Sequence, residues 1–254
     1  LIRRQRQMCI RDRYTAYDVT GDGTKDKIRI RAANQTDDEA YSSLTVSVNG
    51  KTAYRLKNTR FYNVIANIYT LKNGQPFLYL YAPAENGDGP VCALLKYTNG
   101  KFRKILDFTE IMAGYGNHRI GEVTNLNGNK IVITESIVSY SLGINAINFT
   151  YEYVNGKFVP TSRYGSYKEI YSADGSSRYF TVNSDLPAYA RPGATAVNTT
   201  LKTGSLTKII KCALINRKMY IQLECDGEIY WIKALENPPI SDSERQFMEV
   251  RYAG

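Results

Sequence analysis

The motif DVTGDGTKD at residues 18–26 has the residue types and the spacing of a calcium-binding loop. Oxygen-bearing side chains stand at positions 1, 3, 5 and 9, a glycine stands at position 6 where the chain must turn sharply, and position 7 supplies a backbone carbonyl. Calcium prefers such oxygen ligands and takes about six to eight of them. The predicted ligands are Asp18, Thr20, Asp22, Thr24 and Asp26. The sequence therefore predicts one Ca²⁺ site, whose role is to stabilise the loop.

The same motif also has a metal-free interpretation. Position 12 holds Arg29 in place of the bidentate glutamate of a helix–loop–helix calcium site, so the loop is expected between two strands. Aspartate and glycine favour tight turns, and an Asp/Gly-rich hairpin needs no ion. The corresponding loops further along the chain, TLKNGQP and TNLNGNK, lack carboxylates, so only one site is expected to bind.

The residue pattern predicts no catalytic site, and an enzyme is the less favoured interpretation. His118 is the only histidine and is expected in a loop. The sequence has no GxSxG, P-loop or GxGxxG motif that would indicate a nucleophile or a nucleotide site. Cys92, Cys212 and Cys225 form no CxxC pair. We expect independent buried thiols, with a bridge between Cys212 and Cys225 as the alternative.

The first thirteen residues, LIRRQRQMCIRDR, differ from the rest of the chain. Codons for RRQRQMCIRDR can spell the adapter of transposase-based sequencing libraries, so we expect residues 1–13 to be a translated adapter and a signal peptide to have been lost upstream. The chain has 33 basic and 24 acidic residues; without the five arginines and Asp12 of this segment, the net charge falls from +9 to +5. No block of like charges remains, which argues against nucleic-acid binding.

The composition favours strands over helices. The chain contains 21 Tyr, 8 Phe and 1 Trp, and tyrosine is a strong strand former. Alternating tyrosines such as Tyr164, Tyr167 and Tyr171 are expected to cover a sheet surface, with stacking on sugar rings as the alternative. No apolar run approaches the roughly 18 residues that span a membrane, so no membrane span is expected.

The tripeptide Asn-Gly-Lys begins at Asn49, Asn99 and Asn155, at spacings of 50 and 56 residues. Asn-Gly between apolar runs predicts a two-residue type I′ hairpin, because both residues accept positive φ. A second marker, an apolar strand followed by a Gly-containing turn, keeps the same period. We therefore predict an all-β protein with three four-stranded antiparallel units, similar to propeller blades, over residues 14–163.

With DVTGDGTKD in the first unit, these repeats resemble FG-GAP and VCBS-type calcium-loop repeats of β-propellers. The resemblance implies blades over residues 14–58, 61–108 and 119–163. Three blades do not close a ring. The expectation is therefore either further blades upstream or an open array.

Residues 186–235 resemble a bacterial SH3-like (SH3b) domain, which implies a small barrel. The resemblance rests on an aromatic strand with a Pro-containing loop, on the tight turn Asp226-Gly227 and on a final strand with Trp231. Met219-Tyr220 replaces the usual tryptophan of the central strand. The implied ligand residues are Tyr189, Arg191, Tyr220 and Trp231. A linker with one or two strands is expected over residues 164–185, and a tail with a short helix over 236–254.

Together, the two resemblances imply a secreted or cell-surface bacterial protein of the Gram-positive wall. The expected function is non-catalytic binding of peptidoglycan or of a surface glycan or peptide, with the calcium-stabilised repeats as a platform. The alternative is the non-catalytic part of a truncated wall hydrolase or other secreted enzyme. A third possibility is a purely structural chain whose barrel has no free groove.

Overall fold

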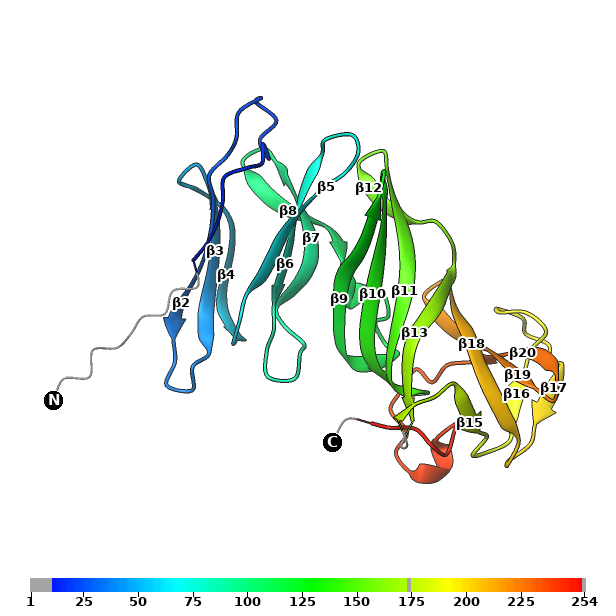
Figure 1. Cartoon of the computed structure of the whole chain (residues 1–254). Helices are drawn as coiled ribbons and strands as arrows, with labels where there is room; N and C mark the ends of the chain where they lie inside the picture. The colour runs from blue at the N-terminus through cyan, green and yellow to red at the C-terminus, as the bar shows by residue number, and fades with distance from the viewer. Residues whose placement is uncertain (1–10, 173–174, 253–254) are drawn as a thin grey trace. The chain divides into compact units, whose positions relative to one another are not determined.

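The computed structural model describes residues 11–172 and 175–252 and is built from antiparallel strands with two short 3₁₀ helices (Figure 1). The chain divides into two compact units. Unit 1 consists of residues 11–107 and Asn127–Asn129, and unit 2 contains Phe108–Leu126 and the described residues from Lys130 onward. The predicted all-β fold class is confirmed.

Unit 1 begins with a four-stranded sheet of order β1-β2-β3-β4. Its strands are β1 (Arg11–Tyr14), β2 (Ile28–Gln35), β3 (Tyr41–Val48) and β4 (Lys51–Phe61). In β2, Ile28 and Ile30 are buried whereas Arg29 and Arg31 are exposed, the alternation expected of a sheet with one face in the core. Residues 1–10 of the predicted adapter segment lie outside the described residues, and residues 11–13 lie in β1, which pairs with β2.

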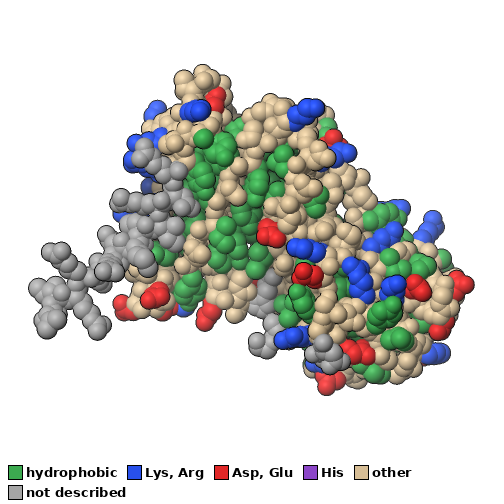
Figure 2. Space-filling view, in the orientation of Figure 1, with side chains coloured by type: hydrophobic (Ala, Val, Ile, Leu, Met, Phe, Trp, Pro, Cys, Tyr) green, Lys and Arg blue, Asp and Glu red, His purple; other side chains and the backbone are tan. Residues whose placement is uncertain are grey.

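The second sheet of unit 1 has the order β5-β6-β7-β8. Its strands are β5 (Ile65–Thr70), β6 (Pro76–Ala82), β7 (Val91–Thr98) and β8 (Lys101–Asp107). Every residue of β6 is buried. Apolar residues from both sheets form one core cluster, from Val19 to Phe102, and Figure 2 shows hydrophobic side chains over this part of the chain.

The three Asn-Gly turns have the predicted geometry. Asn49, Asn99 and Asn155 each have φ of 50°, and the glycines after them have φ of 78–83°. These turns connect β3 to β4, β7 to β8 and β11 to β12. Positive φ at both positions defines the type I′ hairpin, so this prediction is confirmed.

Unit 2 contains the third predicted repeat and continues it into a ten-stranded sheet. The repeat consists of β9 (Gly116–Asn127), β10 (Lys130–Ser139), β11 (Gly143–Val154) and β12 (Lys157–Pro160), after the 3₁₀ helix η1 (Phe108–Glu110). The segment predicted as a linker is part of this sheet. Its strands are β13 (Tyr164–Ser172), β14 (Gly175–Ser176) and β15 (Tyr179–Thr181), and β13 pairs with both β11 and β18. The predicted boundary near residue 163 therefore does not separate two compact units.

The predicted SH3-like segment forms five antiparallel strands of unit 2, two in a sheet of their own and three in the ten-stranded sheet. Its strands are β16 (Leu186–Ala188), β17 (Thr199–Leu201), β18 (Leu206–Ile215), β19 (Lys218–Cys225) and β20 (Glu228–Lys233). A bridge between Tyr189 and Trp231 joins the end of β16 to β20. The tight turn predicted at Asp226-Gly227 is present, with φ of 52° and 81°.

The C-terminal segment, expected to be a tail with a short helix, packs on the sheet of unit 2. Its only described helix is the single 3₁₀ turn η2 (Asp242–Glu244). Phe247 is completely buried, forms a bridge with Val182 and packs on the ring of Phe180, with 5.7 Å between the centroids. The apolar residues at the end of the chain therefore complete the core.

Substitution of Gly165 tests whether β13 is part of this core. Gly165 is paired with Cys212, and a Cβ atom at Gly165 would lie 2.5 Å from the ring of Phe149 and 2.7 Å from Ile147. We expect Gly165→Ala to lower the free energy of unfolding of unit 2 by ~1–3 kcal/mol, because overpacking forces these neighbours to shift. The measurement is urea denaturation followed by the fluorescence of the single tryptophan, which lies in unit 2.

The matched control is Ser166→Ala at the next, exposed residue of β13. It should change stability by less than about 0.5 kcal/mol. Equal effects of the two substitutions would contradict the packing of β13.

Candidate functional site

The predicted calcium loop connects β1 to β2 and is organised around one buried carboxylate. Asp26 is only 1% exposed. Its carboxylate accepts hydrogen bonds from the backbone N–H groups of Val19 (2.7 Å) and Thr20 (2.9 Å) and from the Asn49 amide (2.5 Å). Asn49 Oδ1 in turn accepts from Lys27 N–H at 2.8 Å. The first Asn-Gly turn and the aspartate loop are therefore fastened to each other.

The carboxylate of Asp18 holds the tip of the same loop. It accepts hydrogen bonds from the N–H groups of Gly21 (2.6 Å) and Gly23 (2.8 Å) and from the hydroxyl of Thr20 (3.2 Å). Desolvation raises the pKa of Asp18, but the hydrogen bonds from Gly23, Gly21 and Thr20 together outweigh it and leave the pKa below its ordinary value. Asp18 therefore carries a negative charge at neutral pH.

Asp22 forms a separate, exposed turn. Its carboxylate accepts from the hydroxyl and the N–H of Thr24 at 2.6 and 2.8 Å, and these two bonds lower its pKa. This is the usual way in which an aspartate stabilises a turn two residues ahead.

As these side chains lie, their carboxylates already accept hydrogen bonds from the chain. Asp18 and Asp26 both accept from the Thr20 hydroxyl, at 3.2 and 3.3 Å, and all three aspartates accept backbone N–H groups. Within residues 11–172 and 175–252, no group of three His, Cys, Asp or Glu side chains is placed to hold a metal.

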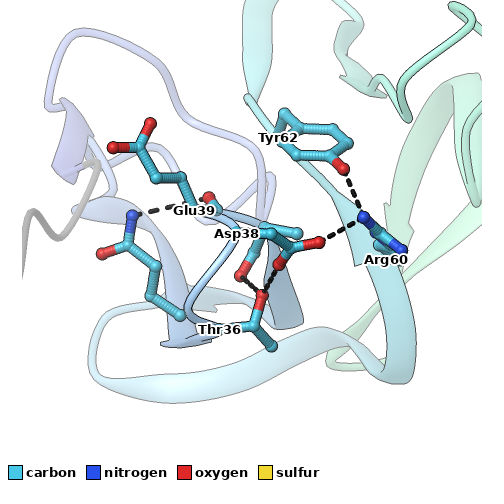
Figure 3. A network of polar contacts seen from close by, with 7 residues as sticks. Thr36, Asp38, Glu39, Arg60 and Tyr62 are labelled. Atoms are coloured by element: carbon cyan, nitrogen blue, oxygen red, sulfur yellow. Dashed lines mark hydrogen bonds and ion pairs between the residues drawn. The ribbon is translucent and has the colours of Figure 1, made fainter.

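A second polar network in unit 1 joins the β2–β3 loop to the end of β4 (Figure 3). Asp38 accepts hydrogen bonds from the Thr36 hydroxyl and from Arg60, which also donates to the Tyr62 hydroxyl at 2.6 Å. The hydrogen bond from Thr36, and to a smaller extent the charge of Arg60, lower the pKa of Asp38. The hydrogen bond to Tyr62, and to a smaller extent the charge of Asp38, raise the pKa of Arg60. Both charges are well exposed, so this network is a weak surface tie.

Three of the four residues predicted to bind ligand in the SH3-like segment form one aromatic cluster. Tyr189, Tyr220 and Trp231 are buried, with 7%, 5% and 4% of their surface exposed, and they pack with Ala213. Arg191 is exposed in the loop after β16 and is not part of the cluster. The buried rings form a small core and not an open groove.

The strand register explains why residues far apart in sequence meet over this cluster. Ser166, Lys211, Gln222 and Trp231 are successive cross-strand partners on β13, β18, β19 and β20, and the bridge to Tyr189 extends the row. Directly opposed residues of antiparallel strands project from the same face of a sheet. A second row of cross-strand partners, displaced by two residues along each strand, consists of Tyr164, Ala213, Tyr220 and Lys233.

Cations lie over tyrosine rings at the solvent side of these rows. Tyr164 packs against Trp231 with 5.9 Å between ring centroids, and its own ring faces Lys211 Nζ at 4.5 Å and Arg163 Cζ at 5.2 Å. We call Arg163, Tyr164, Lys211, Lys233 and Tyr189 the basic face. Figure 2 shows Lys and Arg side chains over the strands of unit 2.

The second ring–cation pair of the basic face is formed by Tyr189 and Lys233, with Nζ 5.2 Å from the ring centroid. Such contacts contribute about 0.5–1 kcal/mol each at exposed sites. The ring attracts the cation without neutralising it, so the positive charge stays available to an anion. The sequence did not predict a role for Lys211 or Lys233, because these side chains reach the tyrosine rings through the strand register and not through a local motif.

Cys212 and Cys225 are separate thiols in unit 2. Cys212 pairs with Ile221 and Cys225 with Thr207, so the two thiols are not joined and both are buried. Burial raises the pKa of Cys212 to about 12, which keeps it protonated and unreactive. His118 lies on strand β9 and not in the predicted loop.

Comparison of the chain with protein-family models, with curated proteins and with solved structures finds no match. The resemblances to FG-GAP or VCBS repeats and to bacterial SH3-like domains therefore stay predictions. Within the described ranges, the structure contains no helix with the length and apolar character needed to cross a membrane. The fold and the sites define an all-β protein with two polar surface features: the aspartate loop and the basic face.

The buried carboxylate predicts a measurable stability effect. In Asp26→Asn, an amide NH₂ group would meet N–H donors, and we expect unit 1 to lose ~1–3 kcal/mol of stability because buried donors become unsatisfied. The readout is native-state hydrogen exchange at the β2 and β3 amides of the full chain. Asp22→Asn, at an exposed turn, is the matched control and should cost less than about 0.5 kcal/mol. Equal protection in both variants would rule out Asp26 as the anchor.

Proposed function

We propose that this chain is a non-catalytic, extracellular or cell-surface bacterial binding protein. In this proposal, the basic face of unit 2 holds an acidic cell-wall polymer, either peptidoglycan with its peptide carboxylates or a charged surface glycan. The localisation rests on the sequence resemblances described above. The ligand class rests on the chemistry of the basic face.

The observation that supports the proposal most is the placement of cations over tyrosine rings. Lys211 and Arg163 flank the half-buried Tyr164, and Lys233 lies over Tyr189. The exposed groups can pair with carboxylates or phosphates of a polymer. The buried rings of Trp231 and Tyr220 hold the half-buried Tyr164 in place, so little conformational entropy is lost on binding.

The alternative is that the chain is the non-catalytic part of a larger wall hydrolase or other secreted enzyme. The same face would then hold that enzyme on its insoluble substrate. Both forms of the proposal require affinity for the wall, and they differ in what the complete gene encodes upstream.

The calcium-stabilised platform is tested separately from wall binding. Because the three aspartates already accept hydrogen bonds from the chain, we expect the same melting temperature in excess Ca²⁺ and in a chelator. A rise in Tm with Ca²⁺ that disappears in Asp22→Ala would instead support the calcium site that the spacing of the motif predicts. Scanning calorimetry of the full chain measures both conditions.

Wall binding is tested with a charge-neutralising double variant. We expect K211Q/K233Q to reduce retention on purified peptidoglycan by up to about tenfold at low salt, because two exposed charge pairs with the polymer, each of about 0.2–1 kcal/mol, are lost. Added salt should weaken retention of the parent chain, since exposed charges are screened. The measurement is a sedimentation assay with increasing polymer.

The matched control is K130Q/K157Q, which removes two exposed lysines of unit 2 that lie on β10 and β12. It makes the same change in net charge and should retain parent binding. An equal loss of retention in both double variants would show that net charge, and not the basic face, causes the binding. No retention of the parent chain would refute the proposal.

A further inference from the structure

Unit 1 contains a polar cleft at the end where the aspartate loop lies. The cleft has a volume of about 550 Å³. Residues 16–21 form one wall, the β5–β6 turn at residues 73–76 forms another, and Tyr97 near the end of β7 closes the third side. In Figure 1, the β1–β2 and β5–β6 connections lie at the same end of unit 1. The volume falls within the range of about 300–1,000 Å³ that is usual for small-ligand sites.

Both main walls of the cleft are held by their own hydrogen bonds. The first is the loop that Asp26 and Asp18 organise through backbone N–H groups. In the second, the N–H of Leu71 donates to Gln75 O at 3.1 Å, and the N–H of Gln75 donates to Asn73 Oδ1 at 3.0 Å. A preformed cleft binds a ligand without first having to order its walls.

Glycines keep the mouth of the cleft open. Gly21 and Gly74, one on each wall, have φ of 77° and 82°, and no atom lies within 4 Å of where a Cβ would stand. A ligand can therefore approach the backbone at both positions, where a side chain would otherwise project.

The lining combines aromatic rings with neutral polar groups. Tyr17 and Tyr97 are half-buried, and the side chains of Asn73 and Gln75 provide amide groups, of which the Gln75 amide also donates to Pro76 O at 3.2 Å. The C–H face of a sugar ring packs on an aromatic face, and paired sugar hydroxyls match the donor and acceptor of a carboxamide. This set of groups suits a neutral, polyhydroxylated ligand.

The charge of the cleft argues against an acidic ligand. Among the residues that the structure describes, no Lys or Arg lines it, and Asp18 is the one charged residue that does. Hydrogen bonds from the loop keep that carboxylate ionised, as described above, so an anion would meet like charge. The cleft therefore differs in chemistry from the basic face of unit 2.

We propose that this cleft binds a neutral sugar unit of a glycan chain, with Tyr17 and Tyr97 as stacking surfaces and Asn73 and Gln75 as hydroxyl partners. The site extends the proposed function, because it lies in the other unit and takes a ligand without charge. It also gives the aspartate loop a role that needs no metal: the loop is a rigid wall of the site.

The test is titration of the full ¹⁵N-labelled chain with cellotetraose, chitotetraose and maltotetraose at millimolar concentrations. We expect at least one of these probes to shift the amide signals of Gly21 and Gly74. Tyr97→Ala should weaken that binding about tenfold or more, the loss of roughly 1.4 kcal/mol or more of contact. Thr70→Arg, which adds bulk at an exposed lining residue and removes no packing, should block it even if Tyr97→Ala unfolds.

Tyr62→Ala is the control, because Tyr62 is a half-buried tyrosine of unit 1 that lies outside the cleft. It should leave binding within about twofold of the parent. K211Q/K233Q should leave it unchanged too, so failure at this cleft and failure at the basic face can be told apart. No shift with any of the three sugars, shifts that survive Thr70→Arg, or shifts produced only by a wall-type peptide would overturn the proposal.

Discussion

The pairing register of the antiparallel strands is the constraint on which the rest of this structure depends. Side chains alternate between the two faces of a strand, so a slip of one residue would exchange the buried and exposed sets. The type I′ turns at Asn49, Asn99 and Asn155 fix the register of three hairpins, because only residues that tolerate positive φ fit there. In the first of these hairpins, Leu44 and Val46 of β3 are buried, whereas Thr45 and Ser47 are partly exposed.

The aspartate loop shows how a motif can satisfy its oxygens without a ligand from outside. Asp18 and Asp26 accept backbone N–H groups that the connection between β1 and β2 would otherwise leave unpaired. The link from Asp26 to Asn49 then ties this connection to the adjacent Asn-Gly turn. The same residues that match a calcium pattern in sequence serve in the structure as the internal supports of a cleft wall.

The two units differ in the surface that each offers to a partner. In unit 2, the strand register places Lys211 over the ring of Tyr164 and Lys233 over the ring of Tyr189. Both rings pack in the aromatic cluster around Trp231. In unit 1, the cleft has amides, hydroxyls and tyrosines and one ionised aspartate. A polymer that carries both acidic groups and neutral sugars contains chemistry suited to each, which is why the two proposed sites are compatible in one wall-binding protein.

Local chemistry determined much of the fold. The Asn-Gly turns, the four-strand repeats and the Asp226-Gly227 turn follow from residues that are neighbours in sequence, and all three were predicted from it. The Tyr164–Ser172 segment was expected to be a linker because its composition is polar. In the sheet, Gly165 and Tyr167 are buried between β11 and β18, a long-range pairing that composition does not reveal.

Only the tertiary structure decided which polar and aromatic groups meet. The sequence predicted Tyr189, Tyr220 and Trp231 as ligand-binding residues, but cross-strand packing buries all three. The same register brings Lys211 and Lys233 to the solvent side of the aromatic cluster. Likewise, the spacing that predicts Asp26 as a metal ligand does not reveal that the fold brings Asn49 to it from 23 residues away. The physical reason is the same in both cases: turns and alternation are set by adjacent residues, whereas burial and hydrogen-bond partners depend on strands that are distant in sequence.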